Sequence, residues 1–308
     1  MTPSELHNIF NNIDTTELLG NDCSPANIFL YQEQYKISTL VKDDVFYRFY
    51  GDFSDTNKKI GFPLPYKTCQ SNYLRDTLLY LTESFNEVEF CFCTEKQTQQ
   101  LNEIISQFFP QYSIQWECNR ERSDYLYLQE NLANLHGQIY QKKKNHVLHF
   151  LKTYDNKWNF SFFTSQNITN KQKEDILQIE EKWFAEKNGD TESNLIEEKR
   201  IIKNATDNFE NLNLIGGIIY IQNTPVAMTL ASPISPSVLD IHFEKSLNEP
   251  AKNGAYAAIN NFFAKECKNF QYLNREEDLG IPGLRKAKLS YKPQIILDKY
   301  SGKLQKSL

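Results

Sequence analysis

The chain has 308 residues, of which 40% are apolar and 24% are charged, and its formal net charge is −5 at neutral pH. This length suits two domains of ordinary size better than one. The negative charge argues against a protein that coats nucleic acid with its whole surface, although it is compatible with a local basic groove. No apolar run approaches the roughly 18 residues of a membrane span, and the N-terminus lacks a signal-peptide pattern. We therefore expect a cytoplasmic protein without a transmembrane segment.

The six cysteines show no spacing of the C-x-x-C type that holds structural zinc. Cys91 and Cys93 alternate along one face of a predicted strand and cannot easily form a disulfide with each other. In a reducing compartment such cysteines pack as small buried hydrophobic side chains. We expect a structural role for all six and no zinc site.

The first half of the chain alternates between predicted strands and helices, which indicates a sheet covered by helices. Two prolines within residues 61–65 predict a loop, because proline cannot donate a hydrogen bond inside a central strand. This half shows neither a glycine-rich phosphate loop nor a nucleophile elbow, so residues 1–150 are predicted to form a structural domain that shapes a cleft. Its predicted elements are helix 24–31, strands 39–41 and 45–50, helix 72–84, strand 88–93, helix 95–109 and strand 113–117.

A basic segment links the two halves. Residues 131–154 contain no Asp or Glu, while lysine occurs at 142, 143, 144 and 152 and histidine at 136, 146 and 149. In an acidic protein this segment is suited to contact phosphate, whether of RNA, a lipid headgroup or coenzyme A. The alternative is a solvated face of an interdomain helix, and the sequence leaves both open. Lys143 and Lys144 are the candidate phosphate contacts.

Residues 151–308 are predicted to form a second domain that carries the site. Thr169 or Asn170 can cap a helix that runs to Lys187, where Asn188 and Gly189 end it. A strongly apolar strand, a turn with Pro225 and a second strand predict a hairpin. The predicted elements are strand 157–165, helices 170–187 and 195–209, strands 214–221, 226–231 and 239–244, and a helix from about 251 or 254 to 267.

The strand 239–244 carries the first candidate site. Because side chains alternate along a strand, Asp240, His242 and Glu244 are predicted to share one face, with Ile241 and Phe243 on the other. Three titratable groups are costly against a dry core, so this face is expected to open on a polar cleft. Three interpretations stay open: an internal hydrogen-bonded network, general acid–base catalysis, for which histidine titrates near neutral pH, and a metal site, which no known motif supports. We expect no metal.

A second candidate site lies at the predicted start of the last long helix. Asn253, Gly254 and Ala255 form a turn of small residues between a strand and this helix. The free backbone N–H groups of such a helix start suit a phosphate or an oxyanion. The turn is therefore a candidate site for donor phosphate.

A third candidate site lies in residues 270–291, which combine a strand, an acidic turn and a short basic helix. The helix is predicted to begin near Pro282 and to end before Pro293. Leu284, Ala287 and Tyr291 share a predicted inward face. The alternative is an ion-paired surface helix. The cations selected here as candidate phosphate ligands are Arg275, Arg285, Lys286 and Lys288.

Three blocks of the sequence resemble one bacterial family. They are NREEDLGIPGLRKAKLSYKP at 274–293, DYLYLQENLANLHGQIYQKKKNHVLHF at 124–150, and GGIIYIQNTPVAMTLASP at 216–233 followed by DIHFEKS and NGAYAAINNFFAKE. The family is similar to the soluble C-terminal domain of phosphatidylglycerol lysyltransferases, and most members are uncharacterised. The resemblance implies an α/β (α+β) fold of two tandem domains similar to Gcn5-related N-acetyltransferases, as in Fem-type aminoacyltransferases. Each domain is a mixed twisted sheet flanked by helices.

The resemblance also implies a function. The chain is expected to transfer an activated acyl group, with aminoacyl-tRNA as the donor, to an amine or hydroxyl acceptor such as a lipid headgroup. His242, Glu244 and Asp240 are the expected catalytic residues, with His242 or Glu244 as the base. Acyl-CoA is the alternative donor, although the usual run of alternating glycines is reduced here to Gly254. The other alternative is a catalytically inactive binding or regulatory protein that keeps the fold. No cofactor beyond the donor is expected, and the sequence does not set the oligomeric state.

Overall fold

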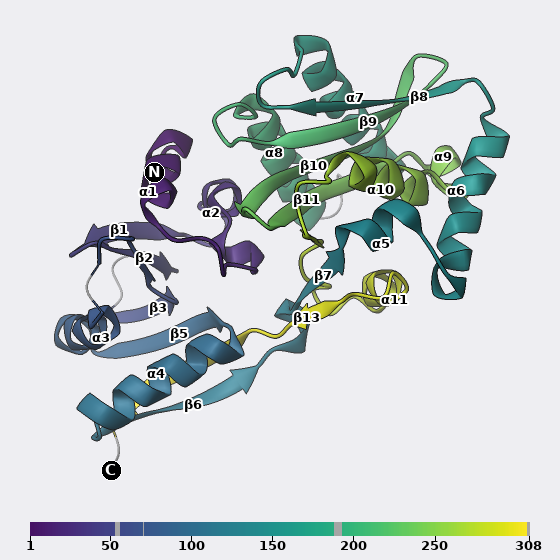
Figure 1. The fold of residues 1–308 in the computed structure, drawn as a ribbon. Coiled ribbons are helices and arrows are strands. Elements are labelled where there is room, and N and C mark those ends of the chain that lie inside the picture. Colours follow the sequence, from purple (N-terminus) through teal and green to yellow (C-terminus); the bar gives the residue numbers. More distant parts are fainter. Residues whose placement is uncertain (53–55, 70, 188–192, 307–308) are drawn as a thin grey trace.

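The computed structural model describes residues 1–52, 56–69, 71–187 and 193–306. These residues form two lobes, each built on a seven-stranded mixed sheet with flanking helices (Figure 1). The predicted α+β fold class, with a mixed twisted sheet in each half, is confirmed.

The first lobe is built on a sheet with the strand order β1–β2–β3–β5–β14–β6, and β4 also pairs with β2. All neighbouring strands are antiparallel except β3 and β5, which run parallel. The strands are β1 (Ser38–Lys42), β2 (Val45–Tyr50), β3 (Asn57–Gly61), β4 (Leu64–Pro65), β5 (Glu87–Cys93), β6 (Tyr112–Cys118) and β14 (Tyr300–Lys306).

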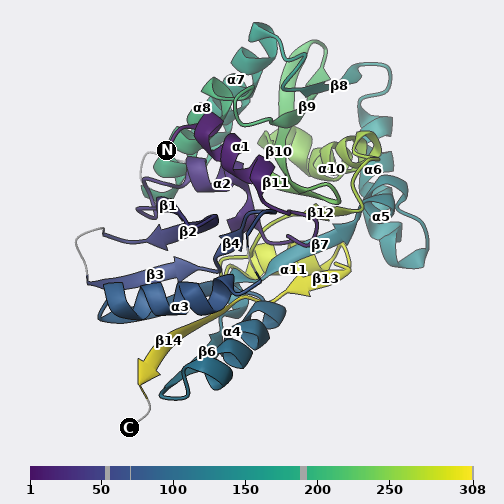
Figure 2. The same ribbon diagram turned by 60° about the vertical axis from the view of Figure 1, so that its left-hand side comes forward.

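Helices α3 (Tyr73–Ser84) and α4 (Glu95–Phe108) pack side by side against this sheet (Figure 2). Helix α4 begins at a capping box, in which the Thr94 hydroxyl accepts from the Gln97 N–H and the Gln97 side chain accepts from the Thr94 N–H. Its buried residues Leu101 and Ile105 lie one turn apart and face the core. The other short helices of this lobe are α1 (Pro3–Asn12), η1 (Asn21–Cys23), α2 (Pro25–Leu30) and η2 (Arg120–Arg122).

The second lobe is built on a sheet with the order β13–β7–β12–β11–β10–β9–β8. Its neighbouring strands are antiparallel except β11 and β12, which run parallel. The strands are β7 (Asp124–Leu128), β8 (Trp158–Thr164), β9 (Ile215–Ile221), β10 (Thr224–Ser235), β11 (Val238–Ser246), β12 (Tyr272–Asn274) and β13 (Ile295–Leu297).

Helices cover both faces of this sheet. Ile218 and Ile219 are successive residues of β9, so their side chains point to opposite faces. Ile218 packs with residues of α7 and α8, and Ile219 packs with residues of α6 and α10. Asn188 and Gly189, which the sequence predicts to end α7, lie outside the described residues. The helices of this lobe are α5 (Gln129–Asn134), η3 (Gln138–Tyr140), α6 (Gln141–Thr153), α7 (Asn170–Glu186), α8 (Ser193–Asp207), α9 (Asn248–Lys252), α10 (Ala255–Glu266) and α11 (Pro282–Leu289).

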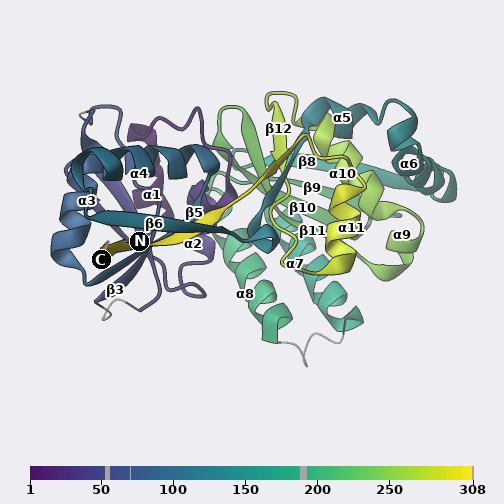
Figure 3. The ribbon, with the colours of Figure 1, turned by 90° about the horizontal axis from the view of Figure 1, so that it is seen from below.

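The chain crosses between the lobes twice. Strand β7 follows the first lobe and enters the second sheet, and after β13 the chain returns so that β14 lies between β5 and β6 (Figure 3). The sheets therefore divide the chain near residue 120 and again near residue 298, and not at residue 150, where the sequence predicted a domain boundary. The sequence did not predict the return of β14 to the first sheet, because the pairing of a strand with distant strands carries no local sequence signal.

A buried ionic network connects the two segments of chain that pass between the lobes, near residue 124 and near residue 299. The Lys299 ammonium lies 2.8 Å from Asp124 Oδ1 and 3.5 Å from Asp22 Oδ1. Asp124 also accepts hydrogen bonds from the Asn21 backbone N–H and from the Asn274 side chain, at 2.8 and 3.0 Å. Burial alone would lower the pKa of Lys299, but Asp124 and Asp22 raise it above its ordinary value. Lys299 is therefore charged and holds together residues that are far apart in sequence.

Two local predictions need correction. Residues 61–65 are not all loop, because Leu64 and Pro65 form the short strand β4 at a sheet edge, where proline is tolerated. Cys118 is exposed and Cys69 is half-buried, so not all six cysteines are core residues. In the described part of the chain, no helix is both long enough and apolar enough to cross a bilayer.

Candidate functional site

A cavity of about 1650 Å³ lies between the two lobes. The first lobe contributes side chains of β5 and β6 to its wall, and the second lobe contributes those of β11, α8, α11 and the turn after β12. Side chains of α2 and of α6 also line the cavity. The lining residues that bear on function are Asn27, Lys143, His242, Glu244, Arg275, Glu276, Lys288 and Tyr291.

The parallel strands β11 and β12 separate at this cavity. They pair from Val238 with Tyr272 as far as Asp240 with Asn274, and the described residues show no pairing between them beyond that point. The chain then continues through His242 on one side of the opening and through Glu276 on the other. Side chains rather than backbone hydrogen bonds bridge the opening.

Strand β11 contains a β-bulge at His242. Leu230 of β10 pairs with Phe243, and the next residue, Ala231, pairs with Ile241, so His242 is the extra residue. The bulge interrupts the alternation of side chains. Phe243 packs with residues of α7 and α8, whereas Ile241 packs with residues of α10.

The bulge corrects the predicted polar face of this strand. Asp240 and His242 lie towards α2, where Asn27 reaches Asp240, whereas Glu244 lies towards α10 and accepts a hydrogen bond from Asn260 at 3.2 Å. The prediction that all three titratable side chains share one face is therefore wrong. Strict alternation would have held only without the inserted residue.

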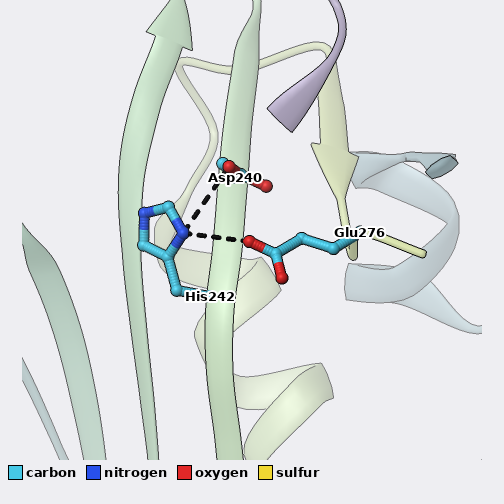
Figure 4. A group of neighbouring side chains, drawn as sticks. All are labelled: Asp240, His242 and Glu276. Atoms are coloured by element: carbon cyan, nitrogen blue, oxygen red, sulfur yellow. Dashed lines mark hydrogen bonds and ion pairs between the residues drawn. The ribbon is translucent and has the colours of Figure 1, made fainter. Parts of the chain in front are cut away.

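His242 is the centre of a polar cluster (Figure 4). Its Nδ1 atom lies 3.1 Å from Glu276 Oε1 and 3.5 Å from Asp240 Oδ2. Its Nε2 atom lies 2.8 Å from the hydroxyl oxygen of Ser232, which in turn lies 3.2 Å from that of Ser24. Both ring nitrogens therefore have partners, and the imidazole orientation is fixed.

Asp240 is fully buried beside this histidine. Burial raises the pKa of Asp240 well above its ordinary value, and the nearby carboxylates of Glu276 and Asp124 add to this rise. The Asn27 amide donates to Asp240 Oδ2 at 3.2 Å and to Glu276 Oε1 at 3.1 Å. The described residues offer no partner to Asp240 Oδ1 or to Asn27 Oδ1, although both atoms are buried.

Glu276 lies in a turn that Lys288 holds in place. Its φ of +55° is uncommon for a residue other than glycine and requires support from the surrounding structure. The Lys288 ammonium supplies it by donating to the backbone carbonyls of residues 275, 276 and 277. Burial, with Arg275 nearby, lowers the pKa of Lys288 to about 8. Lys288 is thus a positioning residue, and its ammonium is engaged by the backbone.

The opposite part of the wall carries basic and aromatic side chains. Arg275 donates to Glu244 Oε1 at 2.9 Å and lies over the ring of Tyr291 at 4.9 Å, and its Nη1 is buried without a partner among the described residues. The Lys143 ammonium lies 3.8 Å from the centre of the same ring. Burial, together with Arg275 and Lys142, lowers the pKa of Lys143 to about 8. These two cations form a compact positive group, which we call the Lys143–Arg275 pair.

Several predicted phosphate ligands lie away from the cavity. Arg285 binds Asp278 through two hydrogen bonds, of 2.7 and 2.9 Å, and Lys286 and Lys144 are exposed. Asn253, Gly254 and Ala255 are absent from the described cavity wall, because α6 packs over the start of α10.

The turn formed by Asn253, Gly254 and Ala255 contacts α6 closely. A Cβ atom added to Gly254 would lie 2.2 Å from the carbonyl oxygen of His146. Gly254 is needed for this approach and for its φ of +96°. Asn253 meanwhile donates to the Tyr154 hydroxyl at 2.9 Å and to Glu249.

Sequence reasoning missed two members of the cluster, Asn27 and Glu276. Glu276 had a usable signal, because it belongs to the acidic turn that the sequence singled out between a strand and a basic helix. Asn27 had none, since it lies in the first lobe, 213 positions before Asp240. Only tertiary packing brings α2 to β11.

The fold is a pair of lobes, each with a mixed sheet flanked by helices, and a cavity lies between the lobes. Residues 17–302 match the family model described as "Phosphatidylglycerol lysyltransferase, C-terminal". The chain therefore belongs to the family of phosphatidylglycerol lysyltransferase C-terminal domains.

Solved structures agree with this assignment. A conserved protein of unknown function from Bacteroides thetaiotaomicron is 28% identical, with a TM-score of 0.84 over 99% of this chain and 98% of that one. L-PGS from Bacillus licheniformis is 10% identical, with a TM-score of 0.63 over 97% of this chain and 91% of that one. FemX is 9% identical, with a TM-score of 0.51 over 98% and 96% of the two chains. The last two likenesses bear on the fold alone. No curated protein matches the chain.

Proposed function

We propose that the chain is an aminoacyl transferase that moves an aminoacyl group from aminoacyl-tRNA to an amine or hydroxyl acceptor, such as a lipid headgroup. The observation that carries this proposal is the cavity between the lobes, whose wall has a part with the cations Lys143 and Arg275 and a part rich in carboxylates. An aminoacyl ester on a tRNA end has phosphates on one side of the reacting carbonyl and an ammonium group on the other. The two parts of the wall match these two charges.

The Lys143–Arg275 pair is the proposed site for donor phosphate. Arg275 Nη1 is a buried donor without a partner in the described structure. Lys143 belongs to the same cavity wall, and both cations lie over the ring of Tyr291. An anion would complete the hydrogen bonding of Arg275 and would reduce the repulsion between the two cations.

The Asp240–His242–Glu276 cluster is the proposed site of acceptor activation. Glu276 Oε1 is held by His242 and Asn27, whereas Oε2 has no partner among the described residues and is not sealed from solvent. The acceptor oxygen or nitrogen attacks the ester carbonyl carbon, and its proton passes to Glu276. The bond from that carbon to the ribose oxygen breaks, and the ribose oxygen takes up the proton. Glu276 assumes the role that the sequence assigned to His242 or Glu244, because both of those side chains are fully engaged.

The packing of α6 argues against acyl-CoA as the donor. Gcn5-type domains bind the donor pyrophosphate at the turn that corresponds to Asn253–Ala255. Here the His146 carbonyl lies against Gly254, and the Asn253 side chain is bound to Tyr154 and Glu249. A pyrophosphate would have to displace α6 to reach the backbone N–H groups of α10.

A binding protein without catalysis is the second candidate function. It is favoured by the internal pairing of His242 and of Glu244, which leaves neither side chain free to accept a proton. This candidate predicts that charged tRNA binds in the cavity but that no aminoacyl group leaves it.

A transfer assay with variants of Glu276 tests the proposal. The purified chain would be mixed with tRNA charged with radiolabelled amino acids and with a bacterial lipid extract, and label would be followed into the lipid and small-amine fractions. Glu276→Gln is expected to lower the transfer rate roughly 100-fold, because the proton acceptor is lost, while tRNA affinity stays within about twofold. Glu117→Gln, a carboxylate change on the first-lobe wall, is the matched control and should transfer at the wild-type rate. Binding of charged tRNA without transfer by the wild type would instead support the binding protein.

The affinity for phosphodiesters should depend on pH through Lys143. The groups around its ammonium are Arg275, Glu244 and Tyr291 on the cavity side and Lys142 and His146 on its own helix. Because its pKa is lowered to about 8, Lys143 loses its charge as the pH rises through 8, and affinity for a short CCA-ended RNA should fall roughly tenfold between about pH 7 and pH 9.5. Lys143→Arg should remove this dependence, since arginine stays charged. An equally steep fall in Lys143→Arg would contradict the assignment.

A further inference from the structure

We propose that Asp240, His242 and Glu276 bind a divalent transition-metal ion, with the Asn27 amide as a fourth contact. This site goes beyond the proposed transfer reaction and does not depend on it. The geometry of four side chains from α2, β11 and the turn after β12 supports it.

The spacing of the ligand atoms fits a small coordination sphere. His242 Nδ1 lies 3.1 Å from Glu276 Oε1 and 3.5 Å from Asp240 Oδ2, and the three ligand atoms lie within 4.8 Å of one another. Bonds of ~2.1 Å to nitrogen and oxygen would separate neighbouring ligands by roughly 3.0–3.4 Å at octahedral and tetrahedral angles. The observed separations therefore leave room for an ion after small side-chain movements. Figure 4 shows both carboxylates directed at the same ring nitrogen.

Among the buried acceptor atoms that lack partners in the described structure, Asp240 Oδ1 and Asn27 Oδ1 belong to this cluster. Asp240 is 0% exposed and its Oδ1 accepts nothing, and Asn27 is 7% exposed and its Oδ1 accepts nothing. Buried acceptors without donors are rare in folded proteins because they lose the hydration that they have in the unfolded chain. A cation would satisfy Asp240, and a half-turn of the Asn27 amide would bring its oxygen to the same ion.

The surroundings of His242 resemble those of a metal-binding histidine. Its Nε2 atom faces the Ser232 hydroxyl at 2.8 Å, so Nε2 can carry the proton and donate it to Ser232 while Nδ1 presents a lone pair to the ion. Ser24 lies behind Ser232 at 3.2 Å and orients the hydroxyl. Two lysines near the cluster bind other groups: Lys299 forms an ion pair with Asp124, and Lys288 donates to backbone carbonyls. Among the described residues, no lysine or arginine forms an ion pair with Asp240 or Glu276.

The ligand set selects the class of ion. One imidazole with carboxylate and amide oxygens suits Mn²⁺, Fe²⁺ or Zn²⁺, whereas Mg²⁺ and Ca²⁺ prefer oxygen ligands alone. An ion held at Glu276 Oε1 would also lie at the cavity wall, next to the carboxylate oxygen Oε2 that faces the acceptor.

The competing explanation is a proton. A protonated His242 would donate from Nδ1 to both carboxylates and would account for the same distances without any ion. The two explanations differ in whether the cluster takes up a metal stoichiometrically, and a binding experiment separates them.

Mn²⁺ binding to the full chain, followed by the electron paramagnetic resonance signal of the free ion, tests the site directly. Wild-type protein freed of metal with EDTA is expected to bind one Mn²⁺ per chain at micromolar concentrations. His242→Ala and Asp240→Asn should each weaken binding by roughly 100-fold, because each removes a ligand, and Ser232→Ala should weaken it by about tenfold through the orientation of the ring. Glu117→Gln, which removes a carboxylate elsewhere on the cavity wall, should bind as the wild type does.

Two further measurements keep the result independent of folding defects in the variants. Asn27→Asp adds a charged ligand and should bind Mn²⁺ more tightly, which a damaged fold would not produce. In the unaltered protein, added Zn²⁺ should shift the Nδ1 resonance of His242 in a nitrogen spectrum of the imidazoles and leave the other four histidines unchanged. Absence of stoichiometric binding by the wild type, or equal binding by wild type and His242→Ala, would overturn the site. Transfer activity does not enter either result, so failure of the transfer proposal would be seen separately.

Discussion

Replacing Lys299 with methionine is expected to lower the free energy of unfolding by about 3–5 kcal/mol. Lys299 is 3% exposed and is ion-paired with Asp124, which is 0% exposed. Methionine has a similar length, so the main change is the loss of charge. The Asp124 carboxylate would then remain buried without a cation at the place where β7 and the returning chain meet. Urea denaturation followed by circular dichroism measures this loss.

Two controls identify the cause of the Lys299 effect. Lys303→Met changes an exposed lysine four residues further along the chain and should alter stability by less than about 0.5 kcal/mol. The double change Lys299→Met with Asp124→Asn removes both charges and should recover part of the loss, because no ion is left unpaired. A decrease of less than about 1 kcal/mol in the free energy of unfolding for Lys299→Met alone would show that the ionic network contributes little to stability.

Replacing Gly254 with alanine is the second change with a large expected effect, a loss of more than about 3 kcal/mol. The new methyl group would lie 2.2 Å from the His146 carbonyl oxygen, and both atoms belong to helices or their caps and cannot move alone. The positive φ of +96° adds backbone strain. Thermal unfolding measures the combined cost.

Gly137→Ala is the matched control for the contact with α6. Gly137 has a φ of +83°, but a Cβ atom there meets nothing within 4 Å, so it carries the strain without the collision. With a ψ of 165°, its backbone lies in a region that strongly favours glycine, so the expected cost is about 1–3 kcal/mol. Because α6 also carries Lys143, Gly254→Ala should weaken phosphodiester binding as well, and Gly137→Ala should not. Equal losses of stability in the two variants would remove the proposed role of the α6–α10 contact.

Local signals predicted most of the regular structure. The apolar strand and the Pro225 turn of the β9–β10 hairpin and the prolines around α11 act within a few residues, and the corresponding elements lie close to where the sequence predicted them. The turn at Gly254 shows the limit of such signals. A glycine at a helix start suits both a phosphate and a close helix contact, and only the packing of α6 distinguishes the two.

Features that depend on distant partners were not predictable. The bulge at His242 exists only relative to the register of β10, so the sequence of β11 alone predicted a regular strand with one polar face. Asn27 joins the cluster because α2 packs between the lobes, and Lys299 meets Asp124 because the chain returns after β13. In each case the decisive contact spans ten or more residues along the sequence, beyond the reach of periodicity.

The position of β14 has a consequence for how the protein is made. This strand separates β5 from β6 in the first sheet, yet the ribosome synthesises it after every other strand described. While the nascent chain emerges, the first lobe has a vacant slot between two strands and exposes their backbone groups to other chains. The lobe that is translated first is therefore completed last, and chaperone capture of the growing chain should persist until β14 has left the exit tunnel.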